Sequence, residues 1–151
     1  MNPTEKLKLL APDLTTAFPR SPRELLAGYV VAARALDKCR AVVAETNGEY
    51  HFDCPLDQTF FDFTGIEAPA FKDHVATGAT DAEVADWITA HSKITDETER
   101  ILWNNKMRYT RPCDMAPKLQ VFLETYIPEN LRKNRPVYVW FDIYDIEEER
   151  L

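Results

Sequence analysis

The sequence predicts a mainly α-helical fold: a compact helical bundle of about five to seven helices, with an apolar C-terminal segment packed on the body. Three observations favour this fold class. Apolar residues recur at three- and four-residue spacing through most of the chain. Several of these apolar runs begin with a proline or a capping box, which are common signals of a helix start. A chain of 151 residues that is 45% hydrophobic and 28% charged can also bury a core.

We expect a loosely ordered N-terminal arm over residues 1–19 and a single helical domain over residues 20–151. The first helix of the domain is expected to begin at the Ser21-Pro22-Arg23-Glu24 sequence. Ser21 can cap this helix, Pro22 suits its first position, and Glu24 lies where a capping box places its acid. Apolar residues then recur at helical spacing: Leu25, Leu26, Tyr29, Val30, Ala33, Leu36 and Val43.

The Asn47-Gly48 dipeptide is expected to end this first helix with a left-handed stop. A β-hairpin is the alternative, because Asn-Gly also favours a tight β-turn. A second helix is expected from Pro55 to Gly65 and a third, short helix from Pro69, which Gly78 would stop.

The second half of the chain repeats these signals. Thr80 and Glu83 form another capping box before an apolar face. Thr95 or Asp96 is expected to cap the next helix, and one more helix is expected to close at Pro128. The final residues, PVYVWFDIYDIEEERL, are ambiguous: β-branched and aromatic residues favour a strand, but the chain offers no clear partner strand. We interpret them as an apolar segment packed on the body, with a short helix as one form.

Composition argues against several classes of partner. The net charge of −7 does not favour nucleic acid or an anionic membrane, because binding to either usually needs a basic surface. No apolar run has the ~20 residues of a membrane span, and the N-terminus lacks a signal-peptide core. The three cysteines are an odd number at unrelated spacings, which favours reduced thiols in a cytoplasmic protein.

The segment Gly48–Gly65 is the strongest candidate for a functional site. It places His51, Cys54 and several carboxylates among aromatic rings. His51 and Cys54 could be half of a metal site, since imidazole and thiolate both suit zinc or iron, but no further ligand lies at a recognisable spacing. Alternatively, Cys54 at a helix start could be a nucleophile with His51 as base and Asp57 as a third group, although the charges of Asp53 and Asp57 would oppose thiolate formation. A hydrogen-bonded histidine and a packed thiol are the structural alternative.

Basic residues suggest a second chemical feature. Arg20 and Arg23 flank the expected helix start at Ser21, and Lys38 lies further along the same segment. Free N–H groups with guanidinium groups can bind a carboxylate or phosphate. The alternative is that these charges pair with nearby acids such as Asp37 on a solvated or half-buried face.

Four blocks of the sequence resemble a known family: PRSPRELLAGYVVAARALDKCRA (Pro19–Ala41), GEYHFDCPLDQTFFDFTGI (Gly48–Ile66), GATDAEVADWI (Gly78–Ile88) and WFDIYDI (Trp140–Ile146). In their order and spacing they are similar to the bacterial domain-of-unknown-function family 5069. The resemblance covers most of the chain and implies a small soluble bacterial protein. It supplies no reaction, cofactor or catalytic residue.

The sequence therefore predicts a small-molecule site, for binding or catalysis, where the Ser21 helix start meets the His51–Asp57 turn. An anionic ligand is the expected partner. The chemical groups would be His51, Cys54 and Asp57, and the ligand-binding groups Arg20, Arg23 and Lys38. The alternative is a non-catalytic module that binds another protein through the aromatic segment Tyr138–Tyr144. The sequence leaves the metal, the cofactor and the oligomeric state open.

Overall fold

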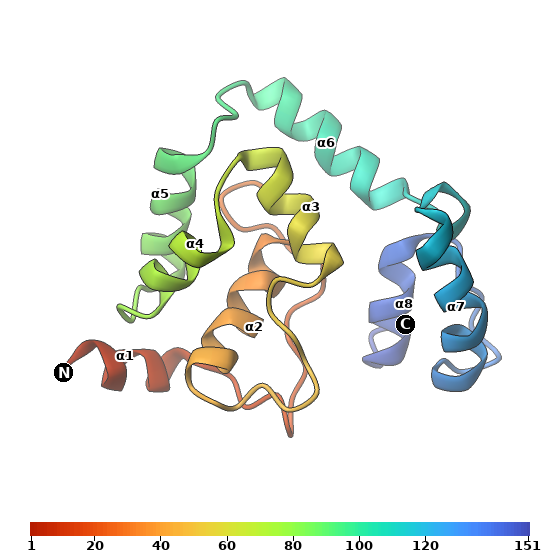
Figure 1. The fold of residues 1–151 in the computed structure, drawn as a ribbon, viewed down its shortest axis with the longest axis horizontal. Coiled ribbons are helices and arrows are strands. Elements are labelled where there is room, and N and C mark those ends of the chain that lie inside the picture. Colours follow the sequence, from red (N-terminus) through yellow and green to blue (C-terminus); the bar gives the residue numbers. More distant parts are fainter. The chain divides into compact units, whose positions relative to one another are not determined.

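A computed structural model describes all 151 residues of the chain (Figure 1). It contains α-helices, one short 3-10 helix and no strand, so the mainly α prediction is confirmed. There are eight α-helices, one more than the expected range: α1 (Pro3–Leu10), α2 (Ala32–Val43), α3 (Pro55–Thr64), α4 (Ala68–Val75), α5 (Asp81–His91), α6 (Glu97–Tyr109), α7 (Pro117–Asn130) and α8 (Trp140–Glu147).

The chain forms two compact units, Met1–Arg100 and Ile101–Leu151, and α6 passes from the first into the second. The division into an arm over 1–19 and one domain over 20–151 stays a prediction. Within the arm the structure has the helix α1, which Asn2 and Glu5 cap reciprocally and whose Leu7 is buried. No helix in the structure has both the length and the apolar character needed to cross a bilayer.

Helix α2 is the centre of the first unit, where it contacts α1, α3 and α4 (Figure 1). All of its residues from Ala32 to Ala41 are buried, including four that carry charge. Alanines at several of these positions leave room for neighbouring helices to approach closely. Large side chains fill the rest of the interior, notably Phe60 of α3 and Phe71 of α4, neither of which is exposed.

The expected helix start at Ser21 is wrong. Ser21 is buried and closes a turn: its Oγ accepts a hydrogen bond from Arg23 N at 3.1 Å, and its carbonyl accepts one from Glu24 N, also at 3.1 Å. The backbone N–H of Val31 donates to Pro22 O at 2.8 Å and so closes the whole loop. Local capping signals were outweighed because tertiary burial of this segment supports a different set of backbone hydrogen bonds.

A tight turn takes the place of the first half of that helix. Leu26 and Tyr29 exchange backbone hydrogen bonds of 3.1 and 2.9 Å. The two residues between them, Ala27 and Gly28, both have positive φ, at 54° and 80°. Positive φ at both central positions is the requirement of a type I′ turn. Helix α2 begins only after this turn, at Ala32.

Neither expectation for Asn47-Gly48 is correct. Helix α2 already ends at Val43, and the two residues belong to a separate turn in which Tyr50 N donates to Asn47 O at 2.9 Å. Gly48 has a φ of 53°, which suits this turn. No strand flanks the turn, so there is no hairpin.

The next helix starts lie where local chemistry places them. Helix α3 begins at Pro55 with Cys54 as its N-cap, and Gly65 ends it at a φ of 75°. At the start of α5, Thr80 Oγ1 accepts from Glu83 N and the Glu83 carboxylate accepts from Thr80 N, as the capping box predicts. Gly78 does not stop α4 directly, because that helix ends earlier, at Val75.

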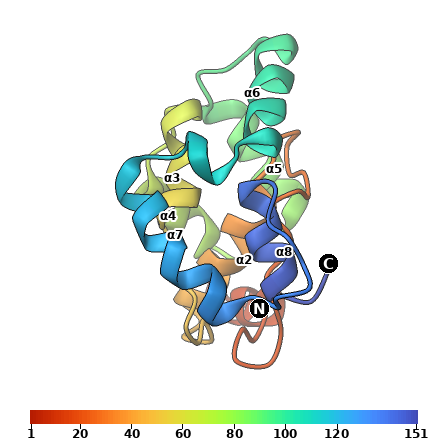
Figure 2. The same cartoon turned by 90° about the vertical axis from the view of Figure 1, so that its right-hand side faces the viewer.

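The second unit contains most of α6, then α7 and α8, which are neighbours in space (Figure 2). The Tyr126 hydroxyl of α7 donates to the Glu147 carboxylate of α8 at 2.7 Å. Pro128 does not close α7, which continues to Asn130. A proline in the last turn removes only one helical hydrogen bond, and the chain tolerates this. Part of the ambiguous C-terminal segment, Trp140–Glu147, is a helix, and Asp142 accepts hydrogen bonds from Tyr138 N and Val139 N at 3.0 Å.

Candidate functional site

Cys54 and Lys38 are brought together by the packing of α2 against α3. Cys54 is the N-cap residue of α3 and is half-buried, whereas Lys38 lies in the middle of α2 with 3% of its side chain exposed. The Lys38 ammonium donates a hydrogen bond to Cys54 Sγ at 3.1 Å. A half-buried cysteine therefore has a buried cation in hydrogen-bond contact with its sulfur.

Asp57 holds this lysine in place from the first turn of α3. Its Oδ2 lies 3.0 Å from Lys38 Nζ and also accepts a hydrogen bond from Asp53 N at 2.9 Å. The carboxylate is completely buried, and its Oδ1 has no hydrogen-bond partner. We call Lys38, Cys54 and Asp57 the thiol cluster.

The thiol cluster places a buried ion pair and a helix N-terminus at one sulfur. Burying a lysine and a carboxylate is costly unless they pair, and here they pair with each other. Asp57 therefore balances the single positive charge of Lys38, while another N–H group of the ammonium donates to Cys54 Sγ. A cation beside the sulfur and a helix N-terminus are both common in the surroundings of reactive cysteines.

The other two cysteines differ from Cys54 in their surroundings. All three thiols are free in the structure, and their reduced state in the native protein stays a prediction. Cys39 follows Lys38 directly but is fully buried, and this burial raises the pKa of its thiol to about 12. Cys113 is exposed and lies in the second unit. Only Cys54 combines access to solvent with a buried cation at its sulfur.

The remaining predicted chemical group, His51, lies on the same loop but takes no part in the cluster. Its side chain is exposed, and no hydrogen bond joins it to Cys54 or Asp57. No group of three His, Cys, Asp or Glu side chains in the structure is placed to hold a metal ion. The structure thus brings Cys54 and Asp57 together with Lys38, and leaves the imidazole outside.

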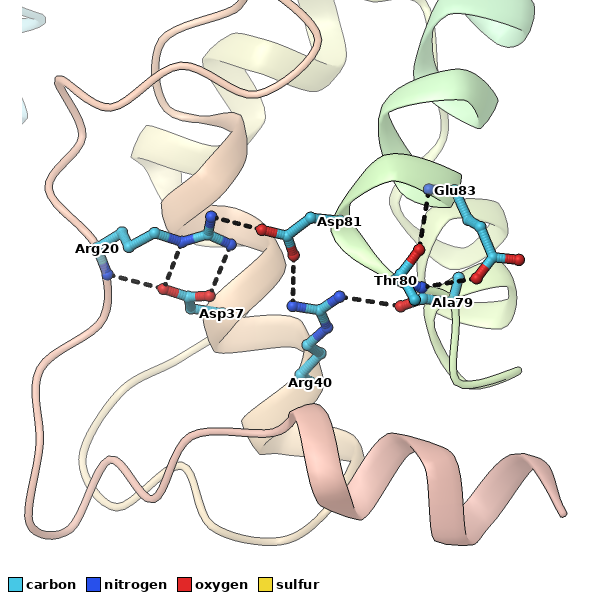
Figure 3. Close-up of polar contacts among 7 residues, drawn as sticks. All are labelled: Arg20, Asp37, Arg40, Ala79, Thr80, Asp81 and Glu83. Carbon is cyan, nitrogen blue, oxygen red and sulfur yellow. Dashed lines mark hydrogen bonds and ion pairs between the residues drawn. The ribbon is translucent and has the colours of Figure 1, made fainter. Parts of the chain in front are cut away.

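Arg20 belongs to a second polar network, which the close-up in Figure 3 shows. Its Nε and Nη2 donate to Asp37 at 3.0 and 2.9 Å, and its Nη1 donates to Asp81 at 2.8 Å. Asp81 also accepts from Arg40 Nη1 at 2.8 Å, and Arg40 Nη2 donates to Ala79 O at 2.9 Å. An anionic ligand at Arg20 would have to displace one of these carboxylates. The network ties α2 to the capped start of α5.

The two arginines control the ionisation of Asp81. Burial favours the neutral acid, but the hydrogen bonds and positive charges of Arg40 and Arg20 outweigh burial and hold the pKa of Asp81 below its ordinary value. In return, the pKa of Arg20 is raised: burial opposes its charge, and the two carboxylates more than compensate. This is the behaviour of a structural ion network.

The other predicted features are not part of the thiol cluster. Arg23 is half-exposed in the turn that Ser21 closes. The aromatic rings of the candidate segment are core: Phe52 stacks on Phe71 with centroids 6.0 Å apart and meets Phe61 edge to face. A shallow cavity of about 220 Å³ lies elsewhere in the first unit, lined among others by Tyr29, Asp96 and Arg100.

The C-terminal aromatic segment offers little surface for docking. In Tyr138–Tyr144, Tyr138 is 72% exposed, but Trp140, Phe141 and Ile143 are buried. These buried side chains are not available to a partner. The exposed apolar side chains of the second unit lie mainly on α6 and α7 instead, for example Leu102, Val121 and Phe122.

The fold and the thiol cluster together define a small all-helical protein with a buried lysine–carboxylate pair at a half-buried cysteine. The chain belongs to the family described as domain of unknown function DUF5069, whose match covers residues 16–150. This match includes every residue of the thiol cluster and of the arginine network, and it confirms the resemblance found in the sequence. No curated protein matches the chain.

The contact between Lys38 and Cys54 was not predicted from the sequence. Lys38 was grouped with the anion-binding arginines, because they share one segment of the chain. The two residues are 16 positions apart on different helices, so their contact depends on how α2 and α3 pack. The available signal was a lysine within a helical stretch that also carries many apolar residues, since a buried lysine requires a partner.

Proposed function

We propose that Cys54 is a reactive thiol that acts as nucleophile in chemistry on a small molecule. The observation that carries this proposal is the 3.1 Å hydrogen bond from the buried Lys38 ammonium to Cys54 Sγ. A cysteine that packs only as a small apolar residue would touch carbon atoms rather than a cation. Asp57 supports the proposal as a positioning residue, because its ion pair holds Lys38 Nζ next to the Cys54 sulfur.

The chemistry follows from this arrangement. The thiolate donates an electron pair to an electrophilic carbon of the substrate, and the leaving group departs with the electrons of the broken bond. Lys38 then stabilises negative charge that develops beside the sulfur, where low polarity strengthens the interaction. A substrate that carries or develops negative charge is therefore favoured. This retains the anionic ligand expected from the sequence, with Lys38 as the basic residue that meets it.

His51 has a secondary role in the proposal. It lies three residues before Cys54, and its exposed imidazole can exchange protons between substrate and water. It does not touch the sulfur, so the reactivity of the thiol itself does not depend on it. His51→Gln therefore serves as a matched control for substitutions within the thiol cluster.

Competitive alkylation tests the proposal. The folded protein is treated with a small excess of iodoacetamide at neutral pH, and mass spectrometry follows each cysteine separately. We expect Cys54 to react faster than the exposed Cys113, while Cys39 stays protected. Lys38→Met should slow Cys54 about tenfold without changing Cys113, since it removes the cation at the sulfur. His51→Gln should leave both rates unchanged.

One combination of alkylation results would overturn the proposal. If Cys54 reacts no faster than Cys113 and Lys38→Met does not alter its rate, the cluster is structural. Because Lys38 is buried, Lys38→Met leaves Asp57 unpaired and can destabilise the fold. Lys38→Arg is therefore measured beside it, since it keeps a positive charge, and both variants are first checked for cooperative unfolding.

A further inference from the structure

We infer that mild oxidation of Cys54 ends in a covalent sulfur–nitrogen bond to Lys38, a reversible modification within the thiol cluster. The inference rests on the proposed reactivity of Cys54 and concerns the regulation of that same site. A reactive thiolate is also the form of cysteine that peroxides oxidise. What becomes of the oxidised sulfur depends on the nearest nucleophile, and here that nucleophile is an amine.

The Lys38 amine is the nucleophile that lies in contact with the Cys54 sulfur. Lys38 Nζ is 3.1 Å from Cys54 Sγ, so a bond needs only a small movement of a flexible lysine side chain. Cys39 is fully buried, and its raised pKa of about 12 keeps it as an unreactive thiol. Cys113 belongs to the second unit.

The oxidation proceeds in two balanced steps. In the first, the Cys54 sulfur attacks hydrogen peroxide: an S–O bond forms, the O–O bond breaks, and water leaves, so that sulfur loses two electrons to give a sulfenic acid. In the second, the neutral Lys38 amine attacks the sulfur: an S–N bond forms, the S–O bond breaks, and the hydroxyl group leaves as water. Overall, one thiol, one ammonium and one hydrogen peroxide give one sulfenamide, two waters and one proton.

Asp57 supplies the base that the second step needs. The Lys38 ammonium must lose a proton before it can attack, and Asp57 Oδ2 lies 3.0 Å from Nζ. Oxidation to the sulfenic acid removes the negative charge from sulfur, and with it one of the two anions that stabilise the ammonium. A buried ammonium–carboxylate pair can then neutralise itself by proton transfer. The completely buried Oδ1 of Asp57, which has no partner, gives the resulting carboxylic acid a second site for its proton.

The bond would protect the thiol. A sulfenic acid that finds no nucleophile is oxidised further to sulfinic acid, which most proteins cannot reverse. A sulfenamide is opened by an external thiol, which attacks the sulfur and releases the lysine amine. Lys38 thus has two functions in one position: it stabilises the thiolate in the reduced protein and captures the sulfur after oxidation.

Peptide mapping after oxidation tests this inference on the full chain. The protein is treated with one equivalent of hydrogen peroxide, digested with trypsin without reductant, and analysed by mass spectrometry. We expect a cross-linked peptide lighter than its two components by two hydrogen atoms, in which trypsin has not cut after Lys38. Dithiothreitol should reverse it. Lys38→Arg should abolish it and give sulfinic acid at Cys54, while Cys39→Ala should still form it.

Three results would overturn the inference. They are sulfinic acid at Cys54 of the unaltered protein, a Cys39–Cys54 disulfide with normal cleavage after Lys38, and a cross-link heavier than expected by one oxygen atom. The alkylation experiment separates this failure from failure of the proposed function. If Cys54 alkylates rapidly without cross-linking, only the inference fails; if it neither alkylates rapidly nor oxidises, the proposed function fails as well.

Discussion

Gly78 lies so close to Lys6 of α1 that a Cβ atom at position 78 would be 2.4 Å from the Lys6 Cβ. The same atom would be 3.0 Å from Pro3 O. Atoms of the α1 backbone cannot move aside independently, so only glycine permits this approach. The loop between α4 and α5 is therefore a docking point for the N-terminal helix.

Gly78→Ala should destabilise the first unit and detach α1. Gly78 has a φ of 82°, where alanine is strained by about 1 kcal/mol, and the clash with α1 adds to this cost. Gly65→Ala is the matched control, because Gly65 has a similar φ of 75° but its nearest neighbour is the flexible end of Lys93, at 3.2 Å. We expect about 1 kcal/mol for Gly65→Ala and about 2–3 kcal/mol for Gly78→Ala in urea unfolding.

Hydrogen exchange identifies where the extra cost arises. In Gly78→Ala, amides of α1 should exchange faster, because Leu7 loses its burial when the helix moves away. Equal destabilisation by the two glycine substitutions, with α1 equally protected in both, would contradict the close approach.

Asp81→Asn should destabilise the protein at neutral pH and much less in acid. Asp81 accepts hydrogen bonds from Arg20 and from Arg40, whose side chain is 5% exposed, and the substitution weakens both. Asp81 itself is 48% exposed, so water and salt screen part of the effect, and we expect about 1–3 kcal/mol.

The pH dependence has a definite sign. The folded pKa of Asp81 lies below its unfolded value of about 3.9, so its contribution is complete above that value and is lost as pH falls through the folded pKa. The difference in unfolding free energy between the two proteins should therefore be constant above about pH 5 and shrink as the pH falls below about 4. Asp86→Asn is the control: this exposed carboxylate of the same helix has no ion pair, and its effect should be small throughout. A difference for Asp81→Asn that grows in acid would contradict the network.

Ala27→Asn should stabilise the protein, although Ala27 makes no special side-chain contact. Its φ of 54° is unfavourable for alanine, and asparagine followed by Gly28 is a preferred pair for a type I′ turn. We expect a gain of up to about 1 kcal/mol by thermal or urea unfolding. Ala27→Val should have the opposite effect, because a β-branched residue is disfavoured at positive φ. The turn assignment fails if the valine variant is as stable as the asparagine variant.

The elements that could be predicted are those whose boundaries depend on nearby residues. Pro55 and Gly65 bound α3, and Thr80 with Glu83 begins α5, because the chemistry of a helix end lies within one turn of the chain. The Ser21 sequence carries the same local signals and still forms a turn. At Ser21 the structure is decided by the hydrogen bond from Val31 N to Pro22 O and by the burial of the segment. Neither can be read from the residues next to Ser21.

Only the part of the candidate site that is local in sequence could be predicted. Cys54 and Asp57 share the first turn of α3, and the sequence places them together at a helix start. Their relation to Lys38 depends on the packing of two helices. Arg20 was expected to bind an anion, and its partners Asp37 and Asp81 lie 17 and 61 residues away. The sequence contains these charged residues, but it does not show which of them form ion pairs.

The buried charges of α2 also constrain how the protein can be made. Asp37 pairs with Arg20, which precedes the helix in the chain. Lys38 and Arg40 instead pair with residues that follow the helix: Asp57 for Lys38, and Asp81, 41 residues after Arg40, for Arg40. During synthesis from the N-terminus, α2 therefore leaves the ribosome long before its charges can be neutralised. We expect that a nascent chain stalled ahead of Asp81 stays sensitive to protease, and that folding of the first unit begins only when the start of α5 has emerged.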